Sequence, residues 1–223
     1  TYGYLRSEVL AALANAVVLL LLTVYILYEA YQRFFSPPEV LSTPMLVVAV
    51  IGLAVNLISM RILAAGSQES LNLRGAYFEV LADMLGSIGV IISALIIMFT
   101  GWTLADPIIG AAIGIFIVPR TWVLLTHAVN ILLEGTPIGL DAAKLERDLQ
   151  AIDGVLDVHD LHVWTITSGF DAMSGHLVVA DDADQQSVLR AAQSLLHDDF
   201  GIDHTTIQIE TAATRGKEIR TQV

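Results

Sequence analysis

The sequence of 223 residues contains no cysteine. Disulfide bonds, thiolate nucleophiles and cysteine-based zinc sites are therefore excluded, and any protein metal ligand has to be a histidine, an aspartate or a glutamate. Charged residues are also scarce, at 15% of the chain, against roughly 25% in an average soluble protein. The few basic residues, 11 against 23 acidic ones, leave a net charge of −12. This acidity disfavours nucleic acid as a partner, because binding to phosphates needs Lys and Arg.

The charged residues are unevenly distributed along the chain. Residues 1–135 hold 5 basic and 8 acidic residues, whereas residues 136–223 hold 6 basic and 15 acidic ones. Hydrophobic residues make up 55% of the chain, which is unusual for a soluble globular protein and incompatible with an acidic disordered one. We therefore predict a membrane part over residues 1–135, a small polar domain over 136–212 and a flexible tail over 213–223.

Four apolar segments in the first part are long enough to cross the hydrocarbon core of a bilayer, which takes about 20 helical residues. They cover approximately residues 9–28, 45–64, 76–99 and 108–125. The alternative is a set of buried helices in a soluble protein. It is disfavoured because a chain of this length has no amphipathic shell to cover them. The sequence thus predicts an α-helical membrane domain embedded in a lipid bilayer.

The arginines near these segments predict the orientation of the chain. Arg33 alone flanks one side of the membrane, and four arginines flank the other: Arg6, Arg61, Arg74 and Arg120. Lys and Arg collect on the cytoplasmic side, so both ends of the chain and its acidic domain are predicted to be cytoplasmic. The chain opens with Thr1 and shows no signal-peptide pattern, so we expect an excerpt of a longer chain or a processed start.

The acidic part alternates helical and strand patterns. Helical spacing covers residues 141–152 and 184–200, and strand patterns cover residues 155–167, 172–180 and 205–210. The order α-β-β-α-β predicts a small α+β domain with its helices on one face of a sheet. Because the core of such a domain is small, a partner subunit would help to stabilise it.

Two carboxylates lie inside the third apolar segment. Glu79 and Asp83 are four residues apart, so both lie on one face of the predicted helix. A carboxylate in hydrocarbon costs at least about 2–4 kcal/mol, and such residues usually mark an ion or proton path. The pair is therefore predicted to bind one divalent cation and to carry protons when the cation leaves. The alternative is that Glu79, five residues after Arg74, faces lipid headgroups.

Histidines cluster in the acidic domain. An odd separation predicts that His159 and His162 point to opposite faces of a strand. His159, His176 and Glu210 lie on three predicted strands that can be neighbours, which would give two imidazoles and a carboxylate suited to zinc and similar ions. The alternative is a polar face satisfied by hydrogen bonds. His204 lies roughly 20 Å from Glu210 along an extended strand, so one chain cannot offer both to the same ion.

Several motifs follow one another in a fixed order along nearly the whole chain. In the membrane part they are Thr1-Tyr2-Gly3-Tyr4-Leu5-Arg6, Asn72-Leu73-Arg74-Gly75-Ala76, Asp83-Met84-Leu85-Gly86-Ser87, Asp106-Pro107-Ile108-Ile109-Gly110 and Leu132-Leu133-Glu134-Gly135-Thr136-Pro137. In the acidic part they are His159-Asp160-Leu161-His162-Val163-Trp164 and Thr206-Ile207-Gln208-Ile209-Glu210. This ordered set resembles the cation diffusion facilitators, in the branch of zinc transporters and cobalt-zinc-cadmium resistance proteins.

The resemblance implies a homodimeric antiporter of six spans per chain with a ferredoxin-like cytoplasmic domain. The four spans here look like the family's third to sixth, so the first two are expected to lie outside this sequence. The family builds its transport site from the second and fifth spans, and the fifth-span half normally reads His-x-x-x-Asp. Asp83 matches that pattern, whereas Glu79 occupies the place of the histidine. His159, His176 and Glu210 look like positions at which relatives bind zinc between or beside paired cytoplasmic domains.

The resulting functional prediction is a divalent metal cation efflux transporter of a prokaryotic cytoplasmic membrane, working as a proton antiporter by alternating access. Zinc is the favoured ion, and cobalt, cadmium, manganese and iron remain open. An all-oxygen pair at Glu79 and Asp83 is harder than the usual one and would better tolerate manganese, iron or cobalt. The alternative is a non-transporting membrane subunit that senses metal or acts as a scaffold. An enzyme is not predicted, because the sequence has no catalytic elbow, phosphate loop or nucleotide motif.

Overall fold

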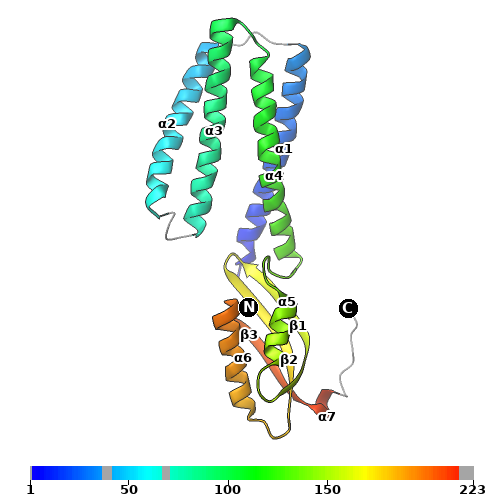
Figure 1. The fold of residues 1–223 in the computed structure, drawn as a ribbon. Coiled ribbons are helices and arrows are strands. Elements are labelled where there is room, and N and C mark those ends of the chain that lie inside the picture. Colours follow the sequence, from blue (N-terminus) through cyan, green and yellow to red (C-terminus); the bar gives the residue numbers. More distant parts are fainter. Residues whose placement is uncertain (1, 37–41, 67–70, 216–223) are drawn as a thin grey trace. The chain divides into compact units, whose positions relative to one another are not determined.

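The computed structural model describes residues 2–36, 42–66 and 71–215 (Figure 1). The chain divides into two units. One unit comprises Val17–Trp122 and contains most of the long helices. The other joins Thr1–Ala16 to Val123–Val223, so the first residues of the chain belong with the C-terminal domain.

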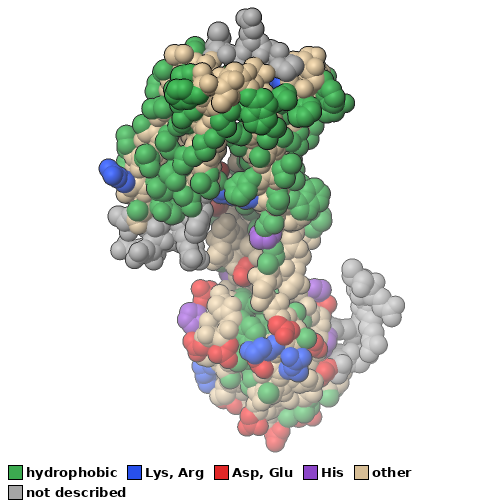
Figure 2. All heavy atoms as spheres, turned by 45° about the horizontal axis from the view of Figure 1, so that its top comes forward, with side chains coloured by type: hydrophobic (Ala, Val, Ile, Leu, Met, Phe, Trp, Pro, Cys, Tyr) green, Lys and Arg blue, Asp and Glu red, His purple; other side chains and the backbone are tan. Residues whose placement is uncertain are grey.

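Four long helices form the N-terminal part of the chain. They are α1 Arg6–Phe35, α2 Ser42–Gly66, α3 Leu71–Thr100 and α4 Ala105–Leu132. Each contains a stretch long and apolar enough to cross a membrane, which confirms the four predicted spans within the described residues. Each helix also extends beyond its predicted apolar segment. Figure 2 shows hydrophobic side chains covering this part of the molecule on the face drawn, whereas charged side chains gather on the C-terminal domain.

An ion pair and a close approach at a glycine link α1 and α4. The guanidinium of Arg33 lies 3.0 Å from Glu29 Oε2 and 2.9 Å from Asp106 Oδ2, so it joins the two helices through a carboxylate in the first turn of α4. Gly114 permits a close approach, because a Cβ at this position would lie 2.9 Å from Leu27 Cδ2. The α1–α4 pair is therefore held by an ion pair and by a helix surface without side chain bulk.

The C-terminal domain has the predicted element order. Its elements are α5 Ala142–Gln150, β1 Val155–Thr167, β2 Phe170–Val179, α6 Gln185–Phe200, β3 His204–Thr211 and α7 Ala212–Arg215. Asp141 caps α5 by accepting a hydrogen bond from Lys144 N, and Asp184 caps α6 through Gln186 N. The predicted tail begins within α7, and residues 216–223 lie outside the described residues.

The sheet has the order β1-β2-β3, with β1 antiparallel and β3 parallel to β2. Helices α5 and α6 cover one face, as the sequence predicts. The core between these helices and the sheet consists of fully or nearly fully buried side chains: Leu145, Leu149, Val158, Val163, Met173, Leu177, Val179, Val188, Ala192, Leu196 and Ile202. Since alternate residues of a strand point to opposite faces, the remaining strand positions form a second face, opposite α5 and α6.

The first residues of the chain contact the ends of the strands. Thr167 Oγ1, at the end of β1, donates a hydrogen bond of 2.8 Å to Glu8 Oε2. The ring of Tyr2 lies 6.3 Å from that of Phe170, at the start of β2, and 5.2 Å from that of His204, at the start of β3. His204 is thus part of an aromatic cluster. Each of the three strands is therefore attached at one end to the N-terminal segment of the chain.

The C-terminal end of α6 carries a pH-sensitive ion pair. His197 Nδ1 lies 2.5 Å from Asp203 Oδ1, and this hydrogen bond, with the charges of Asp203 and Asp198, raises the pKa of His197 above its ordinary value. A pKa that is higher in the folded state stabilises the fold fully below about pH 6.5, and this stabilisation is lost as the pH rises through the raised pKa.

We expect Asp203→Asn to lower the unfolding temperature at about pH 6 and to have little effect at about pH 9, where the imidazole of His197 is neutral. Thermal scans of both proteins at the two pH values measure the difference. An equal change at both pH values would mean that the ion pair does not contribute.

Candidate metal centre

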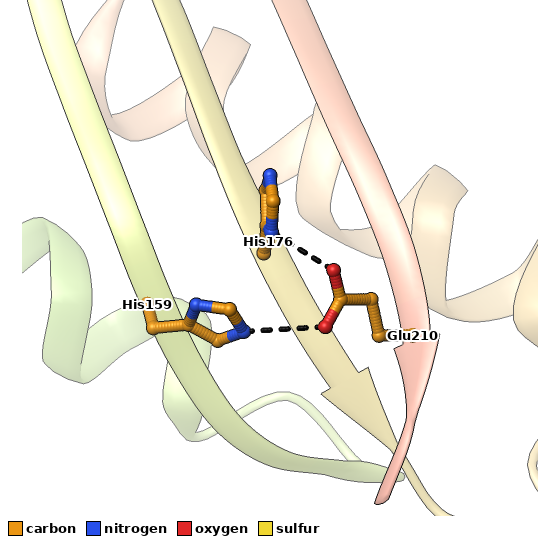
Figure 3. A group of neighbouring side chains, drawn as sticks. All are labelled: His159, His176 and Glu210. Carbon is orange, nitrogen blue, oxygen red and sulfur yellow. Dashed lines mark hydrogen bonds and ion pairs between the residues drawn. The ribbon is translucent and has the colours of Figure 1, made fainter. Parts of the chain in front are cut away.

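Three neighbouring strands place His159, His176 and Glu210 on the face of the sheet opposite α5 and α6 (Figure 3). His159 of β1 lies directly opposite His176 of β2. Glu210 of β3 is in register with Val178, two residues beyond His176, and so points to the same face. These three residues are called the metal centre below.

The distances within the metal centre suit a small cation. His159 Nε2 lies 3.3 Å from Glu210 Oε2, and His176 Nδ1 lies 2.9 Å from Glu210 Oε1. One ligand atom from each residue can be chosen such that all lie within 4.8 Å of one another. Two ligands of a tetrahedral zinc ion, each about 2.0–2.1 Å from it, are about 3.3–3.4 Å apart. Small movements of the two rings would therefore be enough to bind an ion between them.

Glu210 is nearly inaccessible to solvent, with 1% of its side chain exposed, against 22% for His159 and 20% for His176. A buried carboxylate is costly unless hydrogen bonds and positive charge compensate for the lost water. Burial alone raises the pKa of Glu210. The hydrogen bonds from Gln208 and His159 and the charge of the two imidazoles outweigh this, so the pKa lies below its usual value. The centre thus presents an ionised carboxylate beside two imidazole rings.

A β-bulge corrects the prediction for His162. The register of β1 against β2 shifts between His159 and His162, and Asp160 has a φ of 52°. His162 lies opposite Ser174, two residues from His176 along β2, and so points to the same face as His159. The predicted opposite orientation was wrong because the bulge inserts one extra residue into the strand. His162 contacts Asp160 Oδ1 at 3.1 Å, outside the group of close ligand atoms formed by the metal centre.

Glu79 and Asp83 both lie on α3 and are exposed on its surface. Their separation of four residues in a continuous helix places them on one face, as predicted. The side chain of Arg74, the proposed neighbour of Glu79, lies outside the described residues. Exposed carboxylates on an apolar helix need an ion, protons, water or another helix beside them. Their role in transport stays a prediction.

Gln208 and Asp160 were not among the predicted site residues. Gln208 Nε2 donates a hydrogen bond of 2.5 Å to Glu210 Oε1, and Asp160 Oδ2 lies 3.9 Å from His176 Nε2. The two-residue spacing of Gln208 and Glu210 on a predicted strand is a signal that could have identified Gln208. The sequence carries no comparable signal for the bulge at Asp160.

Comparisons with known proteins cover nearly the whole chain. Residues 1–133 match the family described as the cation efflux transmembrane domain, and residues 137–212 match the cation efflux protein, cytoplasmic domain. The metal cation efflux system protein CzcD of Cupriavidus metallidurans is 50% identical over 214 residues, which are 95% of this chain and 67% of CzcD.

Two further relatives have similar coverage. The cadmium, cobalt and zinc/H(+)-K(+) antiporter of Bacillus subtilis is 42% identical over 96% of this chain and 70% of its own length. The zinc transporter ZitB of Escherichia coli is 41% identical over 98% of this chain and 70% of its own length. The solved metal-bound C-terminal domain of the CzcD transporter is 38% identical over 32% of this chain and 99% of that domain, with a TM-score of 0.31. The chain therefore spans about two thirds of the length of these transporters.

Proposed function

Because this chain belongs to the cation efflux family, we propose that it exports divalent metal ions from the cytoplasm in exchange for protons, with zinc as the favoured ion. The chain is a prokaryotic membrane protein with its C-terminal domain in the cytoplasm. The observation that carries the proposal is the match of both the membrane part and the cytoplasmic part to efflux proteins in one continuous order. The names of relatives, which include zinc, cadmium, cobalt, protons and potassium, support zinc as the ion and protons as a counter-ion.

The transport step is assigned to Glu79 and Asp83 on α3. The ion enters from the cytoplasm and binds both carboxylates, and protons replace it when the site opens to the other side. An all-oxygen pair would admit manganese, iron or cobalt more readily than a pair containing histidine.

The cytoplasmic part, residues 136–212, is assigned to metal binding and homodimerisation. The metal centre supplies two nitrogen ligands and one oxygen ligand, a set that suits zinc. Its two imidazole side chains are partly exposed on the sheet face opposite α5 and α6, so a second subunit or water would complete the coordination. Metal bound there would stabilise the dimer by mass action, because only the folded and associated form offers the complete site.

Zinc uptake into inverted membrane vesicles tests the proposed function. In such vesicles export from the cytoplasm becomes uptake into the lumen, so an acidic lumen should drive zinc inward, and an ionophore that collapses the proton gradient should stop it. Luminal zinc is followed with a trapped fluorescent indicator, and vesicles without the protein serve as the control. Zinc uptake at the same rate with and without the proton gradient would contradict antiport. Zinc binding without any uptake would instead favour the alternative of a non-transporting sensor or scaffold subunit.

A further inference from the structure

Gln208 occupies a central place beside the metal centre. It lies on β3 in direct register with His176 of β2, two residues before Glu210 and on the same face. Its Nε2 atom is 2.5 Å from Glu210 Oε1. An ionised carboxylate can only accept hydrogen bonds, so the amide of Gln208 has to present its NH₂ group to Glu210.

We propose that Gln208 is a positioning residue of the metal centre, and that it holds Oε1 of Glu210 so that Oε2 is the oxygen presented to the ion. This inference rests on the proposed function, which assigns metal binding to His159, His176 and Glu210. The geometry divides the carboxylate accordingly. Oε1 receives the hydrogen bond from Gln208 and also lies 2.9 Å from His176 Nδ1. Oε2 lies 3.3 Å from His159 Nε2, the separation expected for two ligands of one zinc ion.

The carboxylate needs such a partner because its last torsion is loosely defined. Rotation about the terminal sp³–sp² bond of Glu has broad minima, so packing alone does not decide whether one oxygen or both face the ion. A hydrogen bond to one oxygen removes that freedom. The ion then meets two imidazole nitrogens and one carboxylate oxygen, and a fourth position stays open for water or a partner subunit.

The same contact also explains how Glu210 is tolerated in its surroundings. With 1% of its side chain exposed, Glu210 has little access to water, and Gln208 provides a neutral donor that does not compete for the cation. A basic residue at position 208 would repel the ion, and an acidic residue would repel Glu210. An amide satisfies both requirements. Hydrogen-bond partners that orient metal ligands are typically worth about 10- to 100-fold in metal affinity.

The test compares four proteins in detergent micelles: the wild type, Gln208→Leu, His159→Ala and Gln193→Leu. Gln193 is an exposed residue of α6 on the far side of the sheet from the metal centre, so Gln193→Leu is the matched control for the same chemical change.

Zinc affinity is measured by competition with a chelating indicator. The visible absorption spectrum of bound Co²⁺ reports coordination number, because four-coordinate Co²⁺ absorbs more strongly than five- or six-coordinate Co²⁺. The difference between the wild type and His159→Ala isolates the signal of the metal centre.

We expect Gln208→Leu to weaken zinc binding at the centre by about 10- to 100-fold. We also expect weaker Co²⁺ absorption, because a freed carboxylate can bind the ion through both oxygens. The metal-free unfolding temperature should fall below that of Gln193→Leu, because the buried Glu210 loses a hydrogen bond. A single cooperative unfolding transition shows that the fold is retained.

Two results would overturn the positioning role alone, given that His159→Ala loses the signal. One is a zinc affinity of Gln208→Leu within about threefold of the wild type, far less than an orienting partner contributes. The other is weaker zinc binding with an unchanged Co²⁺ spectrum, since Gln208 would then act without fixing the carboxylate. If His159→Ala binds zinc as the wild type does, the metal centre itself is refuted, and the role of Gln208 with it.

Discussion

Replacing Asp83 by asparagine is expected to abolish metal transport, with a fall in the initial rate of zinc uptake of roughly 100-fold or more. The amide has nearly the shape of the carboxylate but carries no negative charge and cannot take up a proton. Both properties are needed if the same group binds the cation and then the counter-ion. Asp83 lies well inside α3 and is followed by 17 further residues of this helix, which ends at Thr100. Its carboxylate therefore lies about 25 Å along the helix from Thr100.

The matched control for this substitution is Asp199→Asn on α6, an exposed aspartate outside the membrane-spanning helices. It makes the same chemical change without touching α3, and transport should remain normal. Expression and insertion of both variants are compared by immunoblotting of the vesicles. If Asp83→Asn transports zinc like the wild type, the ion path does not depend on α3, and the assignment of Glu79 and Asp83 has to be abandoned.

Replacing His176 by alanine is expected to lower the zinc affinity of the metal centre by roughly 100-fold or more, because it removes a direct ligand rather than an orienting partner. His176 is the central residue of the three, since β2 lies between the strands that carry His159 and Glu210. Loss of its Nδ1 atom also leaves Glu210 without its contact at 2.9 Å. Competition with a chelating indicator measures the affinity, and sedimentation with and without zinc measures the effect on dimerisation.

His162→Ala is the control for this second experiment. His162 points to the same face but lies beyond the bulge, opposite Ser174, and its side chain contacts Asp160. Its removal should leave zinc binding at the centre unchanged. An equal loss of affinity in His162→Ala and His176→Ala would show that the ion is bound on both sides of the bulge, and the composition of the metal centre would have to be revised.

Periodicity predicted the strands that carry the metal centre but could not predict their register. The β-branched run up to Thr167 correctly indicated β1 from Val155, and the residue types at His159, His176 and Glu210 indicated ligands. Which residues face each other depends on the order and pairing of the strands, and these are decided by the packing of α5 and α6 on the sheet. Only the structure shows that His159 is opposite His176.

The bulge at Asp160 shows why strict alternation fails. The bulge at this residue of positive φ reverses the orientation of the side chains from His162 to Thr165 relative to strict alternation, up to the next register shift before Thr167. Asp is among the residues that tolerate a positive φ, but an Asp within a strand pattern does not by itself predict a bulge. The contacts of Arg33 with Asp106 and of Thr167 with Glu8 could not be predicted from the sequence either, because they join residues 73 and 159 positions apart.

The attachment of the strand ends to the first residues of the chain has a mechanical consequence. Thr167, Phe170 and His204 are the ends of three strands that are hydrogen-bonded to one another along their length. Because the strands are hydrogen-bonded to one another, a displacement of one of them is shared by the other two. The contacts with Glu8 and Tyr2 connect such a displacement to the residues that lead into α1.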